Sequence, residues 1–491
     1  MGLKKDTLFL EICGQFIKNA TILETDKSDS QSIYDIHFIS IYFSNINIVF
    51  HKLNIKFENC TFVYVQIFAN GDDEELNSKF TFVANIWIKF ASPIQLFRFT
   101  TVSFHQNQII NLKKVVKETF LSAVNISLLS IMGAIFNNLT SGTLMKIHNC
   151  KEMIIRDLDM TDINIEQDFS AAIVTSVTDK ITVFLSKFSD IKGTIFHVEH
   201  VNQFDVKDSE FVSCLRRGCI SVTMDSRYPR NIINILNSSF YHCVSVENGG
   251  GLSVKVASSP DALDIGLLNN NRKMPLSISI VKSIFSNCTS RKDGGAISII
   301  NRLSGNIKVF IVYSIFKSNT AYLMGGSIYG HGLSLLGISF CKFDRNVAGL
   351  YGGALCAMEN NALLTLNSSF TNNKVRKKGG VFYVHYSSSI KYVGCIFLRN
   401  NGNIFHDVMK TSGGCIYANN VTKLQIHQCN FATNMARKGG TFHLENINLF
   451  YASECIYVKN QALLGSAIYI TKSVLLLNTK TNFSSNKALQ A

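Results

Sequence analysis

Cysteine is the residue type whose number and spacing most invite a chemical role. The chain of 491 residues has 13 cysteines, so at least one thiol has no partner within the chain. Cys214, Cys243 and Cys288 each stand three residues after a phenylalanine, and stacked repeats would bring them within disulfide range. No C-x₂-C spacing occurs, so a zinc site is not expected. Buried free thiols are the default expectation, with a disulfide in this column as the alternative if the chain is secreted.

A second set of cysteines precedes aromatic residues by two positions. Serine replaces cysteine at this position in other repeats, which favours small-residue packing over metal binding. The members of this position are Cys341, Cys395, Cys429 and Cys455, with Ser314 and Ser368 as the replacements.

One acidic cluster, Asp72-Asp73-Glu74-Glu75, offers the oxygen ligands that Ca²⁺ prefers. It lacks the alternating spacing of a calcium loop, so we expect a solvated loop there. We predict no metal site and no cofactor.

The string from Tyr329 to Ser334, YGHGLS, resembles the G-H-G-L-S word of polygalacturonases, with His331 at its centre. The resemblance implies paired carboxylates upstream that act as general acid and base. On the repeats just upstream of His331, Asp293 stands alone, with no second carboxylate beside it. Downstream, Arg376-Lys377-Lys378 fits that family's Arg-x-Lys word, but it lies in a basic turn before a glycine pair. We therefore predict no catalytic residue and keep a polysaccharide lyase or glycoside hydrolase as the alternative function.

Basic residues recur shortly before glycines. The formal net charge is +14, so an anionic partner is favoured. If repeats stack, the basic turns form a ridge that Met324 and Tyr351 interrupt, and this ridge would bind acidic polysaccharide or a cell-surface ligand. Solvated turns are the simpler alternative. Nucleic acid is not expected, because no aromatic residues interleave with the basic ones outside the predicted core. The basic groups are Arg216-Arg217, Arg291-Lys292, Arg376-Lys377-Lys378 and Arg437-Lys438.

The elements that position these residues come from an internal repeat. An aromatic residue recurs, and from Phe211 onward the third residue after it is Cys or Asn. A glycine pair follows in the repeats from Gly294-Gly295 to Gly439-Gly440 and degrades to Gly465-Ser466 in the next. From Phe316 to Phe397 the aromatics are 27 residues apart, and the 34-residue step to Phe431 contains an insertion, GNIFHDV, after Asn400. The aromatics are Phe188, Phe211, Phe240, Phe285, Phe316, Phe343, Phe370, Phe397, Phe431, Tyr457 and Phe483.

Each repeat holds about three short alternating runs of β type and no helical periodicity. A period of this length indicates a solenoid. We therefore predict an all-β fold: a single-stranded, right-handed parallel β-helix with about three short strands per turn of about 27 residues. In such a fold like residues stack about 4.8 Å apart, so the aromatics form one inward column. A second inward column is Ile297, Ile328, Leu355, Phe382, Ile416, Phe442 and Ile468.

The asparagines and glycines of the repeat have structural roles in the predicted β-helix. Asn346 and its equivalents are predicted to occupy a corner, to adopt a left-handed backbone and to bond the Asn of the next turn. The glycine pairs, such as Gly352-Gly353, are predicted to allow positive φ or a close backbone approach.

Gly294-Gly295-Ala296-Ile297 with Phe285, and Phe343-x-x-Asn346 with Gly352-Gly353-Ala354-Leu355, resemble the repeats of Chlamydia-type polymorphic outer-membrane proteins. Similar repeats occur in surface proteins of some protists, and the resemblance covers residues 185–491. It implies a pectin-lyase-like right-handed β-helix displayed on the cell surface, often in adhesion. We accordingly expect a non-enzymatic structural or adhesive module at the cell surface or outside the cell.

The repeat is expected to be degenerate over residues 1–180 and regular over 181–491. Three degenerate copies of the repeat are recognised in the first part of the chain: Phe104-x-x-Asn107, Phe136 to Gly142 and Cys60-Thr-Phe62. A long surface loop is expected from Pro260 to Pro275. No signal peptide or transmembrane helix is predicted. Because no glycine pair follows Asn486, we expect the chain to be a segment of a longer protein.

Overall fold

The structure is a computed structural model that describes residues 9–14, 16–18, 21–23, 34–51, 53–71, 78–89, 94–116, 119–165, 171–225, 231–257, 276–302, 306–401 and 411–489. The chain divides into two compact units, Met1–Cys214 and Leu215–Ala491, which are described separately. The acidic cluster at 72–75, the loop at 260–275 and the insertion after Asn400 lie outside the described residues.

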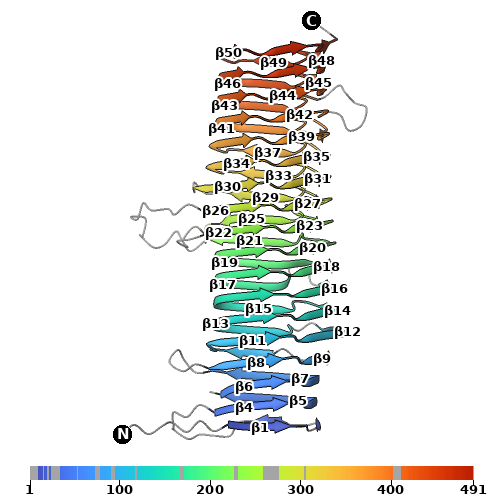
Figure 1. The fold of residues 1–491 in the computed structure, drawn as a ribbon, viewed down its shortest axis with the longest axis vertical. Helices are drawn as coiled ribbons and strands as arrows, with labels where there is room; N and C mark the ends of the chain where they lie inside the picture. Colours follow the sequence, from blue (N-terminus) through green and yellow to red (C-terminus); the bar gives the residue numbers. More distant parts are fainter. Residues whose placement is uncertain are drawn as a thin grey trace, which may run out of the picture. The chain divides into compact units, whose positions relative to one another are not determined.

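Unit 1 (Met1–Cys214) is built from parallel strands, each paired with strands about one turn earlier and later in the chain. Figure 1 shows these turns in blue to green. Its strands are β1 (Phe9–Cys13), β2 (Phe16–Lys18), β3 (Thr21–Leu23), β4 (Tyr34–Ile39), β5 (Tyr42–His51), β6 (Leu53–Glu58), β7 (Thr61–Asn70), β8 (Lys79–Val83), β9 (Ile86–Lys89), β10 (Ile94–Phe97), β11 (Thr101–His105), β12 (Gln108–Val116), β13 (Leu121–Met132), β14 (Ile135–Ser141), β15 (Met145–Arg156), β16 (Asp159–Ile165), β17 (Ala171–Phe184), β18 (Lys187–Lys192), β19 (Thr194–Lys207) and β20 (Glu210–Val212).

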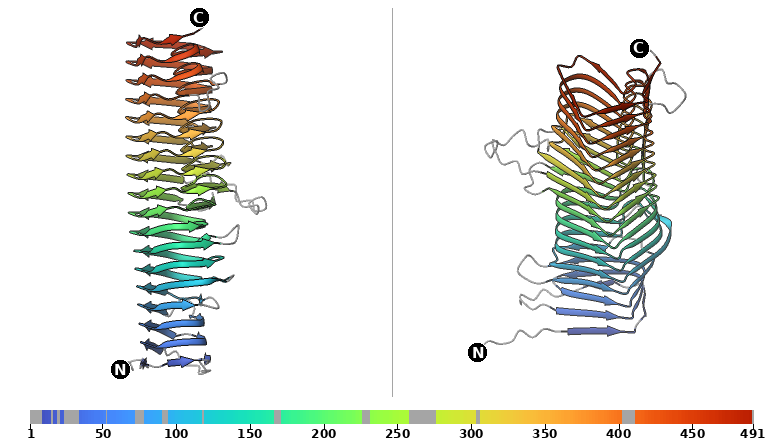
Figure 2. Two further views of the ribbon diagram at one scale, coloured as in Figure 1. Left: turned by 90° about the vertical axis from the view of Figure 1, so that its right-hand side faces the viewer. Right: turned by 45° about the horizontal axis from the view of Figure 1, so that its top comes forward.

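Unit 2 (Leu215–Ala491) follows the same plan with many shorter strands. Equivalent strands of successive turns stack in three columns. A further set of strands, each two to four residues long, stacks at one corner. Figure 2 shows the turns of this unit, green to red, in register. Its strands are β21 (Ile220–Asp225), β22 (Ile232–Leu236), β23 (Ser239–Tyr241), β24 (Val244–Ser245), β25 (Leu252–Ala257), β26 (Leu276–Val281), β27 (Ile284–Ser286), β28 (Thr289–Ser290), β29 (Ile297–Asn301), β30 (Ile307–Val312), β31 (Ile315–Lys317), β32 (Thr320–Ala321), β33 (Ile328–His331), β34 (Leu335–Ser339), β35 (Lys342–Asp344), β36 (Val347–Ala348), β37 (Leu355–Met358), β38 (Ala362–Leu366), β39 (Ser369–Thr371), β40 (Lys374–Val375), β41 (Phe382–Val393), β42 (Ile396–Leu398), β43 (Ile416–His427), β44 (Asn430–Ala432), β45 (Met435–Lys438), β46 (Phe442–Ser453), β47 (Ile456–Val458), β48 (Gln461–Leu464), β49 (Ile468–Thr471), β50 (Leu475–Thr479), β51 (Asn482–Ser484) and β52 (Lys487–Ala488).

The predicted inward columns form the core of unit 2. From Phe240 to Phe483 the repeat aromatics stack ring on ring, with centroids 4.5 to 5.2 Å apart. The second column, from Ile297 to Phe442, is fully buried. The stacking keeps the flat rings in contact over successive turns, which is a favourable arrangement for aromatic side chains. Both predicted columns are confirmed.

A ladder of buried asparagines runs beside the aromatic column. In each step the Oδ1 atom of one Asn accepts bonds from the backbone N–H and the Nδ2 group of the Asn one turn earlier, at 2.9 to 3.1 Å. Each Nδ2 group also donates to a carbonyl oxygen of the turn before, as Asn346 does to Phe316. The predicted amide bond between turns is confirmed. The ladder members are Asn319, Asn346, Asn373, Asn400, Asn434, Asn460 and Asn486.

The predicted left-handed conformation of these asparagines is wrong, because the residue before each Asn adopts it. Ser318, Arg345 and Asn372 have φ values of 54°, 56° and 56°. The corner therefore bends one residue earlier than expected. This leaves the amide of the following Asn free to point inward and bond its neighbours, as Asn319, Asn346 and Asn373 do.

The two glycines of each pair have different roles. Gly352 has a φ of 66°, a conformation that L side chains rarely adopt. A Cβ atom on Gly353 would overlap the carbonyl oxygen of Gly380 in the next turn. Both predicted reasons for the pair are thus confirmed, one for each glycine.

The turns of unit 1 have the same architecture, but different residues occupy the repeat positions. Phe136 pairs with Ile109 and Met160 in its inward column, but Phe104 pairs with Phe82 in another column, so Phe104-x-x-Asn107 is not the repeat word. Asn107 instead accepts bonds from the backbone and side chain of Asn85, both at 3.1 Å. The asparagine ladder therefore stands at a different corner in this unit.

Each unit is thus an all-β parallel β-solenoid, and the predicted fold class is confirmed. The predicted division at residue 180 stays a prediction. Within the described ranges, no helix is long and apolar enough to cross a membrane.

Candidate functional site

The outer side of the glycine-pair sheet in unit 2 carries a column of aromatic side chains with a cysteine and a histidine among them. Successive strand residues point to opposite faces, so the residue after each inward Ile328 equivalent points outward. These outward residues pair in register through β33, β37, β41, β43, β46 and β49. We call them the outer aromatic column: Tyr329, Cys356, Tyr383, Tyr417, His443 and Tyr469.

The turns that precede the glycine pairs fold over this column. Tyr351 lies in one such turn and stacks on Tyr383 at 4.6 Å, and Tyr383 stacks on Tyr417 at 5.4 Å. Tyr417 is only 1% exposed and Tyr383 only 8%. Buried aromatic residues therefore do lie outside the two predicted core columns, beside basic turns, so the absence of such residues is no argument against nucleic acid. These buried rings nevertheless present no free face on which a base could stack.

Lys378 is the basic turn residue that reaches this column. Its Nζ atom donates to the Tyr417 hydroxyl at 2.9 Å and lies 4.3 Å from the ring centroid. Tyr417 in turn donates to Glu445 Oε2 at 2.8 Å. Burial lowers the pKa of Lys378, whereas burial and the bond to Glu445 raise the pKa of Tyr417. The three side chains form a hydrogen-bonded chain that leads from a basic turn to a carboxylate.

A pocket of about 540 Å³ opens beside this chain. Its cationic side chains are Lys378, Arg437, Lys438 and Lys472, and its one carboxylate is Glu445. The ammonium of Lys438 lies 5.2 Å from the centre of the Tyr469 ring. The basic pocket is lined by Lys378, Thr411, Ser412, Tyr417, Arg437, Lys438, His443, Glu445, Tyr469, Thr471 and Lys472.

The predicted basic ridge is only partly assembled. Lys378 and Lys438 are in the same column of turns, with Ser412 between them, and both line the basic pocket. Lys292, by contrast, forms an ion pair with Glu247. The two ridge lysines that line the basic pocket therefore come from the turns that precede β41 and β46, and Met324 and Tyr351 occupy the same column of turns earlier in the chain.

His331 lies at the end of β33, away from the basic pocket. Its Nδ1 atom is 3.2 Å from the Asn301 carbonyl oxygen, and its Nε2 atom is 3.6 Å from Glu359 Oε2. Register places Met358 and then His385 above it, so the Arg376-Lys377-Lys378 turn that leads into β41 lies two turns further on. The two words of the polygalacturonase pattern are thus not side by side.

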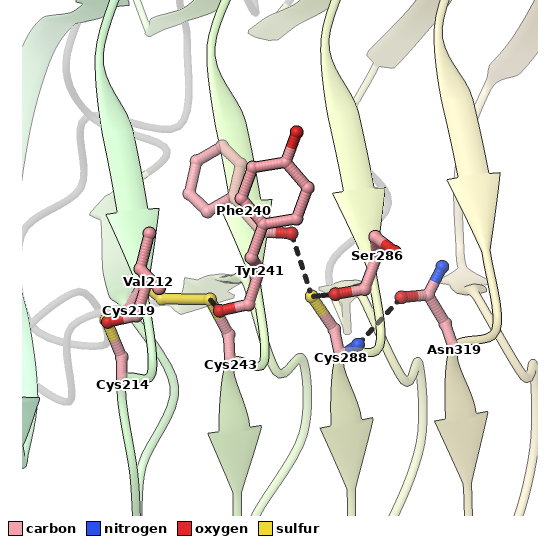
Figure 3. Close-up of a disulfide and its surroundings, with 9 residues drawn as sticks. All are labelled: Val212, Cys214, Cys219, Phe240, Tyr241, Cys243, Ser286, Cys288 and Asn319. Atoms are coloured by element: carbon pink, nitrogen blue, oxygen red, sulfur yellow. Dashed lines mark hydrogen bonds between the residues drawn. A yellow bond between two sulfur atoms is a disulfide. The ribbon is translucent and has the colours of Figure 1, made fainter. Parts of the chain in front are cut away.

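The cysteines divide into one disulfide and free thiols. Cys243 pairs with Cys219, which lies just before β21, and not with another member of the predicted column (Figure 3). Cys288 is free and fully buried, its Sγ atom 3.5 Å from the Phe240 carbonyl oxygen. The default expectation of a buried free thiol therefore fails for Cys243 and holds for Cys288, and the alternative, a disulfide between two members of the column, does not form. The position occupied by Cys341, Cys395, Cys429 and Cys455 holds buried free thiols, as predicted.

Several residues of the basic pocket were absent from the sequence predictions. Tyrosine recurs at four of the six positions of the outer aromatic column, but Cys356 and His443 interrupt it, and Glu445 belongs to no recurring residue type. The available signal was strand alternation: in GGVFYV and GGCIYA, the residue after the inward Phe382 or Ile416 must point outward and is aromatic.

Comparison with known proteins gives no family for this chain: no protein-family model and no curated protein matches it.

Proposed function

We propose that unit 2 is a non-enzymatic binding module that holds an acidic polysaccharide in the basic pocket. The observation that carries this proposal is the composition of that pocket, in which four cationic side chains face one carboxylate. Carboxylate or sulfate groups are natural partners for such a site. Tyr469, which is partly exposed, adds an aromatic surface next to these charges.

The proposed setting is the cell surface or the extracellular space. The resemblance of the FxxN and GGA[IL] repeats to polymorphic outer-membrane proteins supports an adhesive, surface-displayed module. The Cys219–Cys243 disulfide supports an oxidising compartment, where such bonds persist.

Binding to heparin and to polygalacturonate tests the proposal. Lys438→Glu with Lys472→Glu should weaken binding roughly tenfold or more, because both side chains line the basic pocket. The matched control is Lys423→Glu with Lys459→Glu, which makes the same charge change at exposed positions outside the pocket. Titration calorimetry at two salt concentrations measures both variants.

Equal weakening by the two double variants would contradict the proposal, because attraction to the net charge of +14 would then explain binding. A nucleic acid that competes as well as the polysaccharides at equal charge would also contradict it.

A carbohydrate-active enzyme is the second candidate, and the Lys378–Tyr417–Glu445 chain favours it. A lysine with a lowered pKa, hydrogen-bonded to a phenol, can serve in proton transfer. Release of reducing or unsaturated sugar ends from either polysaccharide, lost in Glu445→Gln, would establish this alternative and overturn the non-enzymatic proposal.

A further inference from the structure

A second surface of unit 2, away from the residues of the basic pocket, exposes aromatic side chains at a corner. Tyr313 lies between β30 and β31, and Phe340 lies between β34 and β35 in the next turn. Their rings stack with centroids 5.0 Å apart and planes at 14°. Tyr313 is nonetheless 55% exposed and Phe340 48% exposed. The pair therefore projects from the sheet instead of packing into it.

The backbone at this corner does not favour aromatic residues. Tyr313 and Phe340 have φ values of 52° and 54°, a left-handed conformation that is uncommon for bulky side chains. Every described turn of the unit adopts positive φ at this corner, so the two aromatic side chains, and not the backbone, set these two turns apart. At the same corner, the other described turns of this unit have only polar residues or glycine: Asn237, Lys282, Asn367, Gly394, Gln428, Glu454 and Lys480.

Two more apolar side chains extend the exposed surface on either side of the corner. Phe310 on β30 is 39% exposed, and Ile315 on β31 is 38% exposed. The Phe310 ring lies against Gly337 in the next turn, where any larger residue would press on it. We call Phe310, Tyr313, Ile315 and Phe340 the aromatic corner.

Lysines surround the aromatic corner. Lys282 occupies the corner position one turn earlier, Lys308 and Lys317 lie on β30 and β31, and Lys342 pairs with Ile315; all four are exposed. Asp344 is the only carboxylate in residues 276–290, 306–320 and 335–348, and it is bonded to Thr371 and Arg345. The rim is therefore strongly cationic.

We propose that the aromatic corner docks on the surface of an anionic lipid bilayer. Apolar side chains that project outward can enter the boundary between headgroups and acyl chains, and lysines around them can reach anionic headgroups. Each lysine near such a surface strengthens binding. A projecting corner with a cationic rim fits a deformable anionic surface. This inference is independent of the proposed function, because no residue of the basic pocket takes part.

Sedimentation with vesicles tests the docking surface. The protein should bind vesicles of phosphatidylcholine and phosphatidylserine in equal parts, and bind phosphatidylcholine alone much more weakly. Tyr313→Ser with Phe340→Ser should weaken binding roughly tenfold or more through the lost apolar contact. Lys282→Glu with Lys342→Glu should weaken it at least as much, since removal of one lysine alone is expected to cost roughly fivefold.

The matched control is Tyr386→Ser, which removes an equally exposed tyrosine (55%) from another left-handed corner of the same unit. It should bind vesicles as the unchanged protein does. Circular dichroism checks that each variant keeps its strand content.

A fluorescent variant gives a direct readout. The chain has one tryptophan, Trp87, which is buried in unit 1, so Phe340→Trp adds a single responsive probe. Its emission should shift to shorter wavelength on anionic vesicles and be quenched by brominated lipid. Failure of the unchanged protein to bind anionic vesicles, or full binding by the Tyr313/Phe340 double variant, would overturn the proposal. Self-association or capture of a protein by this surface, without vesicle binding, would overturn it too.

Discussion

At the scale of single residues, His443 should make the stability of unit 2 depend on pH in the acidic range. It is 8% exposed, and burial lowers its pKa to about 4. In the unfolded chain a histidine binds its proton near pH 6.5. Between these values the unfolded state binds more protons, so this residue makes the folded state less stable as pH falls through that window. His443→Phe should therefore reduce the loss of stability between pH 6.5 and pH 4, measured by urea unfolding.

Asp293 provides the contrasting variant. Burial raises its pKa to about 6, above the usual value of 3.8. The folded state therefore binds more protons in the intervening range, and Asp293 makes the fold less stable as pH rises through it. Asp293→Asn should be more stable than the unchanged protein at neutral pH, and the difference should shrink toward pH 4. If both variants changed the pH dependence in the same direction, these assignments would be wrong.

At the scale of elements, the asparagine ladder should contribute more than any exposed polar contact. Asn373 donates to Phe343 and to Asn400 and accepts two bonds from Asn346, all in buried surroundings. Asn373→Ala would leave the buried groups on Asn346 and Phe343 without these partners. We expect the free energy of unfolding to fall by about 2–4 kcal/mol, as measured by denaturant titration.

The control for the ladder is Asn361→Ala, because Asn361 is exposed and makes its hydrogen bonds through the backbone. Its unfolding free energy should stay within about 0.5 kcal/mol of the unchanged protein. A loss of similar size in both variants would show that the ladder adds nothing specific.

At the scale of the whole molecule, the sequence is informative where like residues stack on like. Phe343, Asn346 and Gly352-Gly353 recur because every turn places the same demand on them, so the columns and the fold class could be predicted. The residue that bends the corner could not be identified, because Ser318, Arg345 and Asn372 share a conformation but no residue type.

The outer surface could not be predicted from the repeat, because its residues differ from one turn to the next. Tyr417 and Glu445 meet Lys378 only because β43, β46 and the turn before β41 are stacked, and neither residue belongs to a repeated word. The aromatic corner was hidden in the same way, since Tyr313 and Phe340 look like ordinary strand residues until their left-handed backbone and exposure are known.

The Cys219–Cys243 disulfide should stabilise one part of unit 2 more than the rest. It joins residues 24 apart in sequence, and closing a loop of this length is worth about 3 kcal/mol in the chain-entropy account. A solenoid turn contacts only its neighbours, so the effect should be local. Reduction should lower the unfolding free energy by that amount and increase hydrogen exchange mainly in β21 and β25, with little change in β47.

The matched variants decide whether this bond is responsible. No second disulfide forms among the described residues, so the Cys219→Ser, Cys243→Ser double variant should be insensitive to reductant. Cys288→Ser, which removes a buried thiol outside the disulfide, should keep the full response. If the double variant still lost stability on reduction, or if exchange rose evenly along unit 2, the disulfide would not be the local tie that its position between adjacent turns implies.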